Sequence, residues 1–229
     1  MKENTRRNTL ITVLTVGSLW GIFEATAGYL LHLLPFNIGW LVWYPVASFF
    51  MYSVYQRTGK STDILLIGML SAGIKLMNLM LPVRIDRVLN PAVSILFEAL
   101  SLCAIICVMN KFKKNSIPLK AAAVLMTNTL WRLLYILYIL LLVPDWMREI
   151  SVISSREAFL EFFVIQNLIT SLIILIGLLL YKHLLKPIRL IERRIAELYT
   201  RIPARKKRAA EITAAVLLMI VYISLQLLL

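Results

Sequence analysis

Long apolar runs separated by short polar breaks dominate the pattern along this chain. Runs long enough to cross a bilayer fall at residues 9–34, 38–56, 62–82, 88–110, 118–143, 159–183 and 209–229. A spanning helix needs about 20 mostly apolar residues, and lipid cannot satisfy the backbone of an open, non-helical segment. The breaks carry turn or charge signals, such as Arg57-Thr58-Gly59-Lys60. The pattern therefore predicts an all-α, polytopic membrane bundle of seven transmembrane helices.

Basic residues are distributed unevenly over the predicted loops. The N-terminus, the loops near residues 57–60 and 111–120, and the segment 182–208 together hold 19 Lys and Arg, whereas the alternate loops hold four. Cytoplasmic loops of membrane proteins carry an excess of Lys and Arg. We therefore expect a multi-pass protein of the cell (plasma or inner) membrane, with a cytoplasmic N-terminus and a C-terminus outside.

Composition agrees with this picture and excludes several classes. Of 229 residues, 60% are hydrophobic and 16% are charged, which does not fit a water-soluble globule. Seven spans leave no room for an ATPase or another soluble catalytic module. The net charge of +13 could indicate nucleic acid, but basic loops facing anionic lipid explain it more simply, so we expect no nucleic-acid partner.

The segment 186–208 differs from the spans on either side of it. Apolar residues recur there at alternating spacings of three and four, namely Ile188, Ile191, Ile195, Leu198 and Ile202, with Lys and Arg between them. This spacing predicts an amphipathic helix with a basic face, lying on anionic lipid of the inner leaflet or docking a partner. We accordingly divide the chain into a substrate-binding membrane core (1–185), a cytoplasmic amphipathic helix (186–208) and a C-terminal transmembrane helix (209–229).

Four ionisable residues lie inside the predicted spans, each within about one helical turn of the membrane midplane. They are Glu24, Lys75, Glu98 and Arg132. A charged side chain facing lipid costs at least about 2.5–3.5 kcal/mol, so we expect all four to face the bundle interior. Asn128, Trp131 and Tyr135 share a helix with Arg132 and complete the candidate substrate-binding set.

Three interpretations of these charges remain open. They could form a polar pocket for a small molecule, a buried network that only fixes helix packing, or a path for protons or ions. In the pocket hypothesis, Arg132 and Lys75 hold an acidic or carbonyl group. Glu24 and Glu98 accept hydrogen bonds, and Trp131 or Tyr135 stacks on a ring.

Catalytic motifs are absent from the sequence. There is no DxxxD pair, HExxH motif, Gly-rich phosphate loop or GxSxG elbow. His32 and His183, the two histidines, are predicted at opposite faces of the membrane. The two cysteines, Cys103 and Cys107, provide no metal or disulfide framework. We expect a protein that is not an enzyme and has no metal, cofactor or catalytic residues.

Small residues recur at four-residue spacing on the first predicted helix, at Gly17, Gly21 and Ala25. A small face allows a second helix to approach closely. The face could serve packing within the bundle or docking of another membrane subunit.

Three stretches together resemble the substrate-binding S components of energy-coupling factor vitamin transporters. They are the Gly17-xxx-Gly21-xxx-Ala25 face, the stretch Gly68-Met69-Leu70-Ser71-Ala72-Gly73-Ile74-Lys75, and Asn90-Pro91-Ala92 followed by Glu98. S components are small, basic membrane proteins with a six-helix core and no ATPase of their own. The resemblance covers about residues 9–185, which leaves the seventh span as an addition.

The resemblance implies a function. It implies capture of a vitamin-like nutrient from outside, delivery by toppling of the subunit, and energy from partner ATPases acting through a transmembrane coupling subunit. No residue set matches a known vitamin site, so the ligand stays unnamed. Two alternatives remain: a membrane enzyme acting on a lipid-linked substrate with Glu24 or Glu98 as general base, and a non-catalytic scaffold or regulatory subunit.

Overall fold

The structure, a computed structural model, describes residues 9–23, 38–80, 84–111, 116–181, 183, 197 and 203–228. All regular secondary structure in these residues is helical. The helices are the N-terminal helix Thr9–Phe23, α2 (Trp40–Thr58), α3 (Thr62–Leu76), α4 (Asp86–Met109), α5 (Ile117–Leu142), α6 (Asp145–Arg148), α7 (Arg156–Leu160), α8 (Gln166–Leu179) and α10 (Ala204–Leu228). A 3-10 turn, Met77–Met80, extends α3, and a π-helical turn, Glu161–Ile165, joins α7 to α8.

Each predicted apolar run contains a helix in the part of the chain that the structure describes. Five of these helices are long and apolar enough to cross a membrane: Thr62–Met80, Asp86–Met109, Ile117–Leu142, Arg156–Leu179 and Lys206–Leu225. The N-terminal helix is apolar but shorter over its described residues. The chain is thus an all-helical membrane protein, and among its described residues five helices have the length and apolarity of membrane spans, against the seven spans predicted.

Short sequence signals set several helix ends. Gly59 ends α2 in the left-handed conformation, with φ of 70°, and its N–H donates to the carbonyl of Tyr55. A proline in the first turn of α5 needs no backbone partner there. Ser155 caps α7, since its hydroxyl accepts a hydrogen bond of 3.1 Å from the Ala158 N–H.

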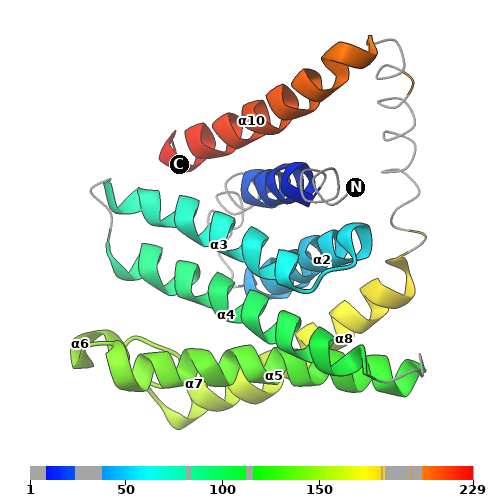
Figure 1. The fold of residues 1–229 in the computed structure, drawn as a ribbon. Coiled ribbons are helices and arrows are strands. Elements are labelled where there is room, and N and C mark those ends of the chain that lie inside the picture. The colour runs from blue at the N-terminus through cyan, green and yellow to red at the C-terminus, as the bar shows by residue number, and fades with distance from the viewer. Residues whose placement is uncertain are drawn as a thin grey trace.

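The helices stack in layers (Figure 1), and apolar clusters lie between them, two of which join three or more elements. The first cluster joins the N-terminal helix to α2, α3 and α4 and is centred on the fully buried Trp20, Met51 and Ile64. Gly68 of α3 lies against the methyl group of Ala99 on α4, so these helices approach closely. The second cluster joins α2, α5 and the π-helical turn, and it is mainly aromatic.

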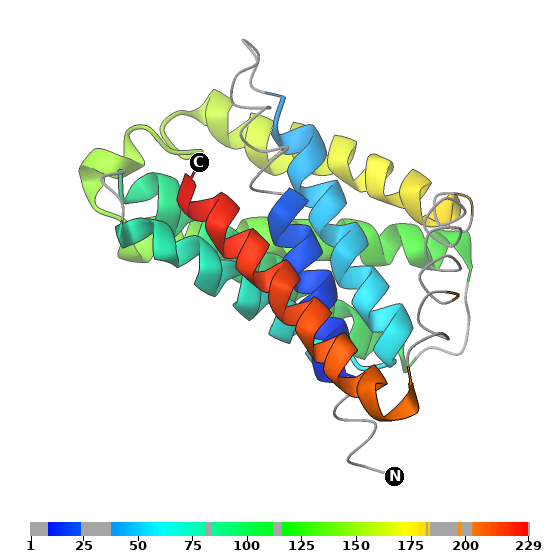
Figure 2. The same cartoon turned by 90° about the horizontal axis from the view of Figure 1, so that it is seen from above.

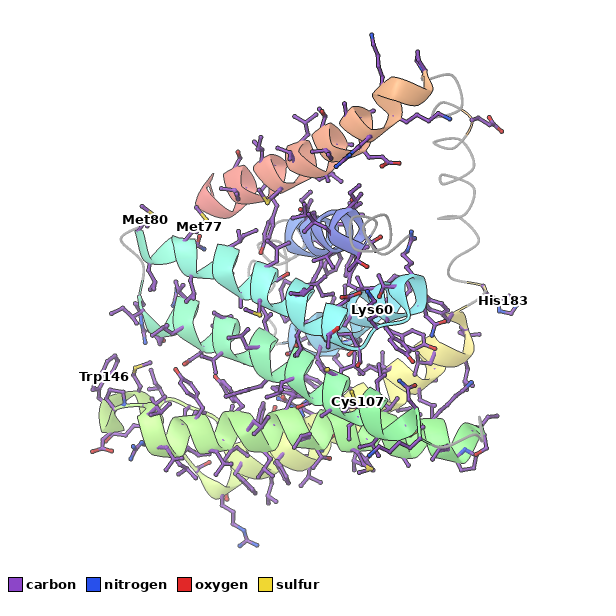
Figure 3. All side chains as sticks on the ribbon, viewed as in Figure 1. Lys60, Met77, Met80, Cys107, Trp146 and His183 are labelled. Carbon is purple, nitrogen blue, oxygen red and sulfur yellow. The ribbon has the colours of Figure 1, made fainter. Side chains whose placement is uncertain are left out.

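The helix α10 lies above the N-terminal helix in Figure 1 and crosses it obliquely in Figure 2. Half of its described apolar side chains are exposed, and among its described side chains only Ala215 and Tyr222 are buried. The connection after α3, marked by Met80, lies at the same end of the bundle as Trp146 of α6, whereas His183 lies at the opposite end (Figure 3). This alternation is what antiparallel neighbouring spans require.

Candidate functional site

Arg132 lies beside Trp131 and Phe162 of the second cluster and is almost completely buried, with 2% of the residue exposed. Its Nε donates a hydrogen bond of 3.3 Å to Oδ1 of Asn128, and Nη2 donates one of 3.3 Å to Oγ1 of Thr170. Two aromatic rings border the guanidinium, whose Cζ lies 4.5 Å from the ring centre of Trp131 and 4.6 Å from that of Phe162. Cation–π attraction is strongest for such desolvated groups.

Asn128, one turn before Arg132 on α5, connects this helix to α8. Its Nδ2 lies 2.9 Å from the carbonyl of Asn167, 2.6 Å from Oγ1 of Thr170 and 2.9 Å from Oγ of Ser171. Its Oδ1 accepts from both Arg132 and the indole N–H of Trp131, the latter at 2.8 Å. A single fully buried amide therefore satisfies several polar groups and fixes the position of the guanidinium.

The polar side of α8 follows helical spacing. Asn167, Thr170 and Ser171 lie at i, i+3 and i+4 and are all buried against α5. Thr170 also donates to the carbonyl of Gln166 at 2.6 Å, a bond within its own helix. Asn167 reaches α5 a second time, because its Nδ2 donates to Oγ1 of Thr129 at 2.9 Å. These bonds hold α5 and α8 in one register.

An acid and a phenol complete the surroundings of Arg132. Glu98 of α4 is 8% exposed and interacts electrostatically with Arg132, and Tyr44 of α2 interacts with both charges. The Tyr44 ring centre lies 5.1 Å from that of Trp131. We call Tyr44, Glu98, Asn128, Trp131, Arg132, Phe162 and Thr170 the Arg132 cluster. The cluster combines a positive group, a negative group and flat aromatic faces, which together suit a small, polar, ring-containing molecule.

The segment between α5 and α7 folds back over one end of this region. Val152 and Ile153 pack against the cluster that contains Trp131 and Phe162, and also against Ile139 and its neighbours. Nε of Arg148 donates a hydrogen bond of 3.1 Å to the Ile139 carbonyl, near the C-terminus of α5. Basic groups stabilise this end of a helix. The fold-back segment therefore covers the Arg132 cluster from the end of the bundle that holds α6.

The structure brings together five of the seven predicted substrate-binding residues: Glu98, Asn128, Trp131, Arg132 and Tyr135. Tyr135 joins through ring contacts, with centres 6.5 Å from Trp131 and 5.9 Å from Phe162. Lys75 lies in the last turn of α3 and is half-buried. Glu24 lies outside the described residues, as does most of the predicted amphipathic segment 186–208.

Sequence reasoning missed Phe162, Tyr44 and the hydroxyls of α8 as parts of the site. The polar spacing of Asn167, Thr170 and Ser171 was a usable signal, because three polar residues on one face of an apolar span mark a buried contact. No equivalent signal identified Phe162. Its contact with Arg132 depends on the π-helical turn, which the apolar pattern does not reveal.

The small face of the N-terminal helix is covered by the same chain. A methyl group added at Gly17 would lie 2.9 Å from Cδ2 of Leu70 on α3, and one added at Gly21 would overlap the ring of Tyr222 on α10. Tyr222 is fully buried, and its hydroxyl donates to the Ser71 carbonyl at 3.3 Å. The close approach that small residues allow thus occurs within the bundle. Ala25, the third residue of the face, lies outside the described residues.

The two cysteines differ in environment, since Cys103 is buried and Cys107 is exposed, with Sγ 3.1 Å from Oγ of Ser61. Within the described ranges, no group of three or more His, Cys, Asp and Glu side chains is placed to hold a metal ion.

Comparisons of the chain with protein-family models, with curated proteins and with solved structures find no match. The functional argument therefore depends on the residues themselves.

Proposed function

We propose that this membrane protein captures a small, ring-containing, acidic molecule and serves as the substrate-binding subunit of a micronutrient uptake transporter. The observation that carries the proposal is the buried Arg132, which is held by two hydrogen bonds and two aromatic rings and whose charge interacts with Glu98 and Tyr44. A fixed guanidinium binds carboxylate or phosphate oxygens, and neighbouring aromatic faces bind a ring. Intramembrane charges of this kind mark substrate sites more often than packing devices.

The roles of the cluster residues follow from their chemistry. Arg132 binds the acidic group, Glu98 accepts hydrogen bonds from ring or amine donors, and Trp131 or Tyr135 stacks on the ring. The fold-back segment with Val152 and Ile153 covers the site. In the proposed orientation, with the N-terminus inside, this cover faces the outside, the side from which the nutrient arrives.

Energy for uptake comes, in this proposal, from partner ATPases acting through a transmembrane coupling subunit, because the described helices form no nucleotide-binding unit of their own. The resemblance to S components suggests that the coupling subunit docks on the small face of the N-terminal helix. The ring of Tyr222 on α10 packs against Gly21 on that face, so docking of a coupling subunit there requires α10 to move aside.

The direct test is identification of the bound molecule. The full-length protein is purified in mild detergent, denatured, and its released small molecules are identified by mass spectrometry. We expect one ring-containing acid at near-stoichiometric amount in the wild type and in Arg156→Gln, whose arginine is exposed on α7, and none in Arg132→Gln. Equal retention by Arg132→Gln, or release of lipid alone by every protein, would overturn the proposal.

A second function is favoured by one observation, the near-complete burial of Arg132. A guanidinium closed off on all sides can fix helix packing alone, as in a non-catalytic scaffold subunit. The two functions differ in what removal of Arg132 does: it strands Glu98 in a scaffold, whereas it removes a ligand contact in a capture subunit. Unfolding measurements on paired variants separate them.

A further inference from the structure

The π-helical turn Glu161–Ile165 lies next to the guanidinium of Arg132. The N–H of Gln166 donates to the carbonyl of Glu161, five residues earlier, which is the bond that defines a π-helical turn. The side chains of the same two residues are also bonded, Nε2 of Gln166 donating to Oε1 of Glu161 at 3.3 Å. The wide turn is therefore closed by both backbone and side chain.

The turn changes which face of the helix Phe162 occupies. In a regular α-helix, the five-residue step from Phe162 to Asn167 would rotate the two side chains about 140° apart. The π-helical turn contains one additional residue, so the same step corresponds to a four-residue step and leaves them about 40° apart. Phe162 consequently lies on the same side as Asn167 and Thr170, and all three are buried.

This alignment places the Phe162 ring against the guanidinium. The rings of Phe162 and Trp131 meet edge to face, with centres 5.7 Å apart and planes at 85°, and Cζ of Arg132 lies within 4.6 Å of both centres. Asn128 and Thr170 hold Nε and Nη2. The rings and the hydrogen bonds together restrict the orientation of the guanidinium, whose charge interacts with Tyr44 and Glu98.

We propose that the π-helical turn sets the orientation of the substrate-binding guanidinium, with Phe162 as the positioning residue that acts through Arg132. This inference rests on the proposed function only in that Arg132 is the group that meets the substrate's acid. Its consequence is that the site recognises a carboxylate or phosphate presented from the α2–α4 side. Without the turn, the guanidinium would keep Asn128 and Trp131 of its own helix but would lose the Phe162 ring on its other side.

The orientation of Arg132 can be measured without a ligand. In protein labelled with 15N-arginine, the Nε–Hε signal of Arg132, assigned by its loss in Arg132→Lys, reports the ring currents of Trp131 and Phe162. Phenylglyoxal, followed by peptide mass spectrometry, reports how accessible the guanidinium is. Phe163 provides the matched control, because its ring lies in the same turn but stacks on Phe159, with centres 5.4 Å apart.

We expect Phe162→Leu to move the Arg132 signal and to raise its labelling rate at least tenfold, and Phe162→Tyr to restore both. Phe163→Leu should resemble the wild type. Deletion of the exposed Val164, which converts the turn to an α-helical one, should act like Phe162→Leu. An unchanged signal and labelling rate in Phe162→Leu would overturn the inference even if the deletion variant fails to fold. Retention of the bound molecule by Arg132→Gln would instead overturn the proposed function and leave the positioning result intact.

Discussion

Two regions of this bundle bury polar side chains in different ways. Around Arg132, amide, hydroxyl and guanidinium groups of α5 and α8 bond to one another in a continuous network. Elsewhere in the described residues, several buried side-chain atoms have no hydrogen-bond partner, and they belong to Ser18, Trp20, Asp63, Ser71, Asn78 and Ser101. Four of these residues lie on the N-terminal helix and α3, which are the two helices that Tyr222 of α10 contacts.

The difference shows that a polar residue has two separate uses inside a membrane bundle. Serine at a crossing such as Ser71 is small, so it permits close helix approach whether or not its hydroxyl is bonded. Asn128 and Arg132 are large and costly to bury, and they are present together with all the partners that fix their geometry. The second arrangement is what a binding site needs, because a ligand must meet groups that already point correctly.

Replacement of the central amide should have the largest effect. Asn128→Leu removes partners from Arg132, Trp131 and Thr170 at once, and we expect a loss of about 3 kcal/mol in the free energy of unfolding. The control is Asn78→Leu, whose buried Oδ1 has no partner and whose change should be neutral within about 0.5 kcal/mol. Reversible unfolding in mixed micelles measures both. Equal losses would mean that the network around Arg132 has no special role in stability.

A methyl group at the helix crossing should have an intermediate effect. Gly21→Ala places Cβ in the ring of Tyr222, and overpacking of this kind costs about 1–3 kcal/mol. Gly73→Ala, on an open face of α3, should instead stabilise the protein by up to about 1 kcal/mol, because glycine is unfavourable within helices. The same unfolding assay applies, and the rate of proteolysis near the C-terminus reports whether α10 has detached from the N-terminal helix. A neutral Gly21→Ala would show that Tyr222 does not occupy this face in the folded protein.

Single hydroxyls should give the smallest effects and the clearest contrast. Thr170→Val keeps the shape but removes the bonds to Asn128 and Arg132, so we expect a loss of about 1 kcal/mol. Ser71→Ala removes a hydroxyl that has no partner and should cost about zero. A larger loss for Ser71→Ala than for Thr170→Val would reverse the comparison between the two regions.

Much of the fold follows from the sequence, because apolar runs of spanning length must be helical in lipid. The helices α3, α4 and α5 begin and end within a few residues of the predicted runs. The sixth run is different: its helix starts at Arg156 and contains a π-helical turn. One additional residue in a turn leaves the apolar pattern nearly unchanged, so no periodicity signals it.

The site could be predicted only in part. Depth along each span predicts Glu98 and Arg132 at compatible levels, and each lies near the middle of its helix. Depth does not specify which way a side chain faces. Lys75, in the last turn of α3, is half-buried and, among the described residues, forms no hydrogen bond with the network around Arg132. Likewise, the glycine spacing predicts close approach but not which helix approaches, and in this structure α3 approaches Gly17 and α10 approaches Gly21.

The central claim, that Arg132 binds a ligand rather than only packing helices, is tested most directly by a double-mutant cycle at Arg132 and Glu98. Free energies of unfolding are measured for Arg132→Gln, Glu98→Gln and the double variant, each freed of its bound molecule. If Arg132 and Glu98 face a ligand rather than form a closed pair, the account predicts that the losses caused by Arg132→Gln and Glu98→Gln add within about 0.5 kcal/mol, so that the double variant recovers no stability. A loss of about 3–5 kcal/mol that the double variant recovers is what a closed structural ion pair requires, and it would contradict the claim.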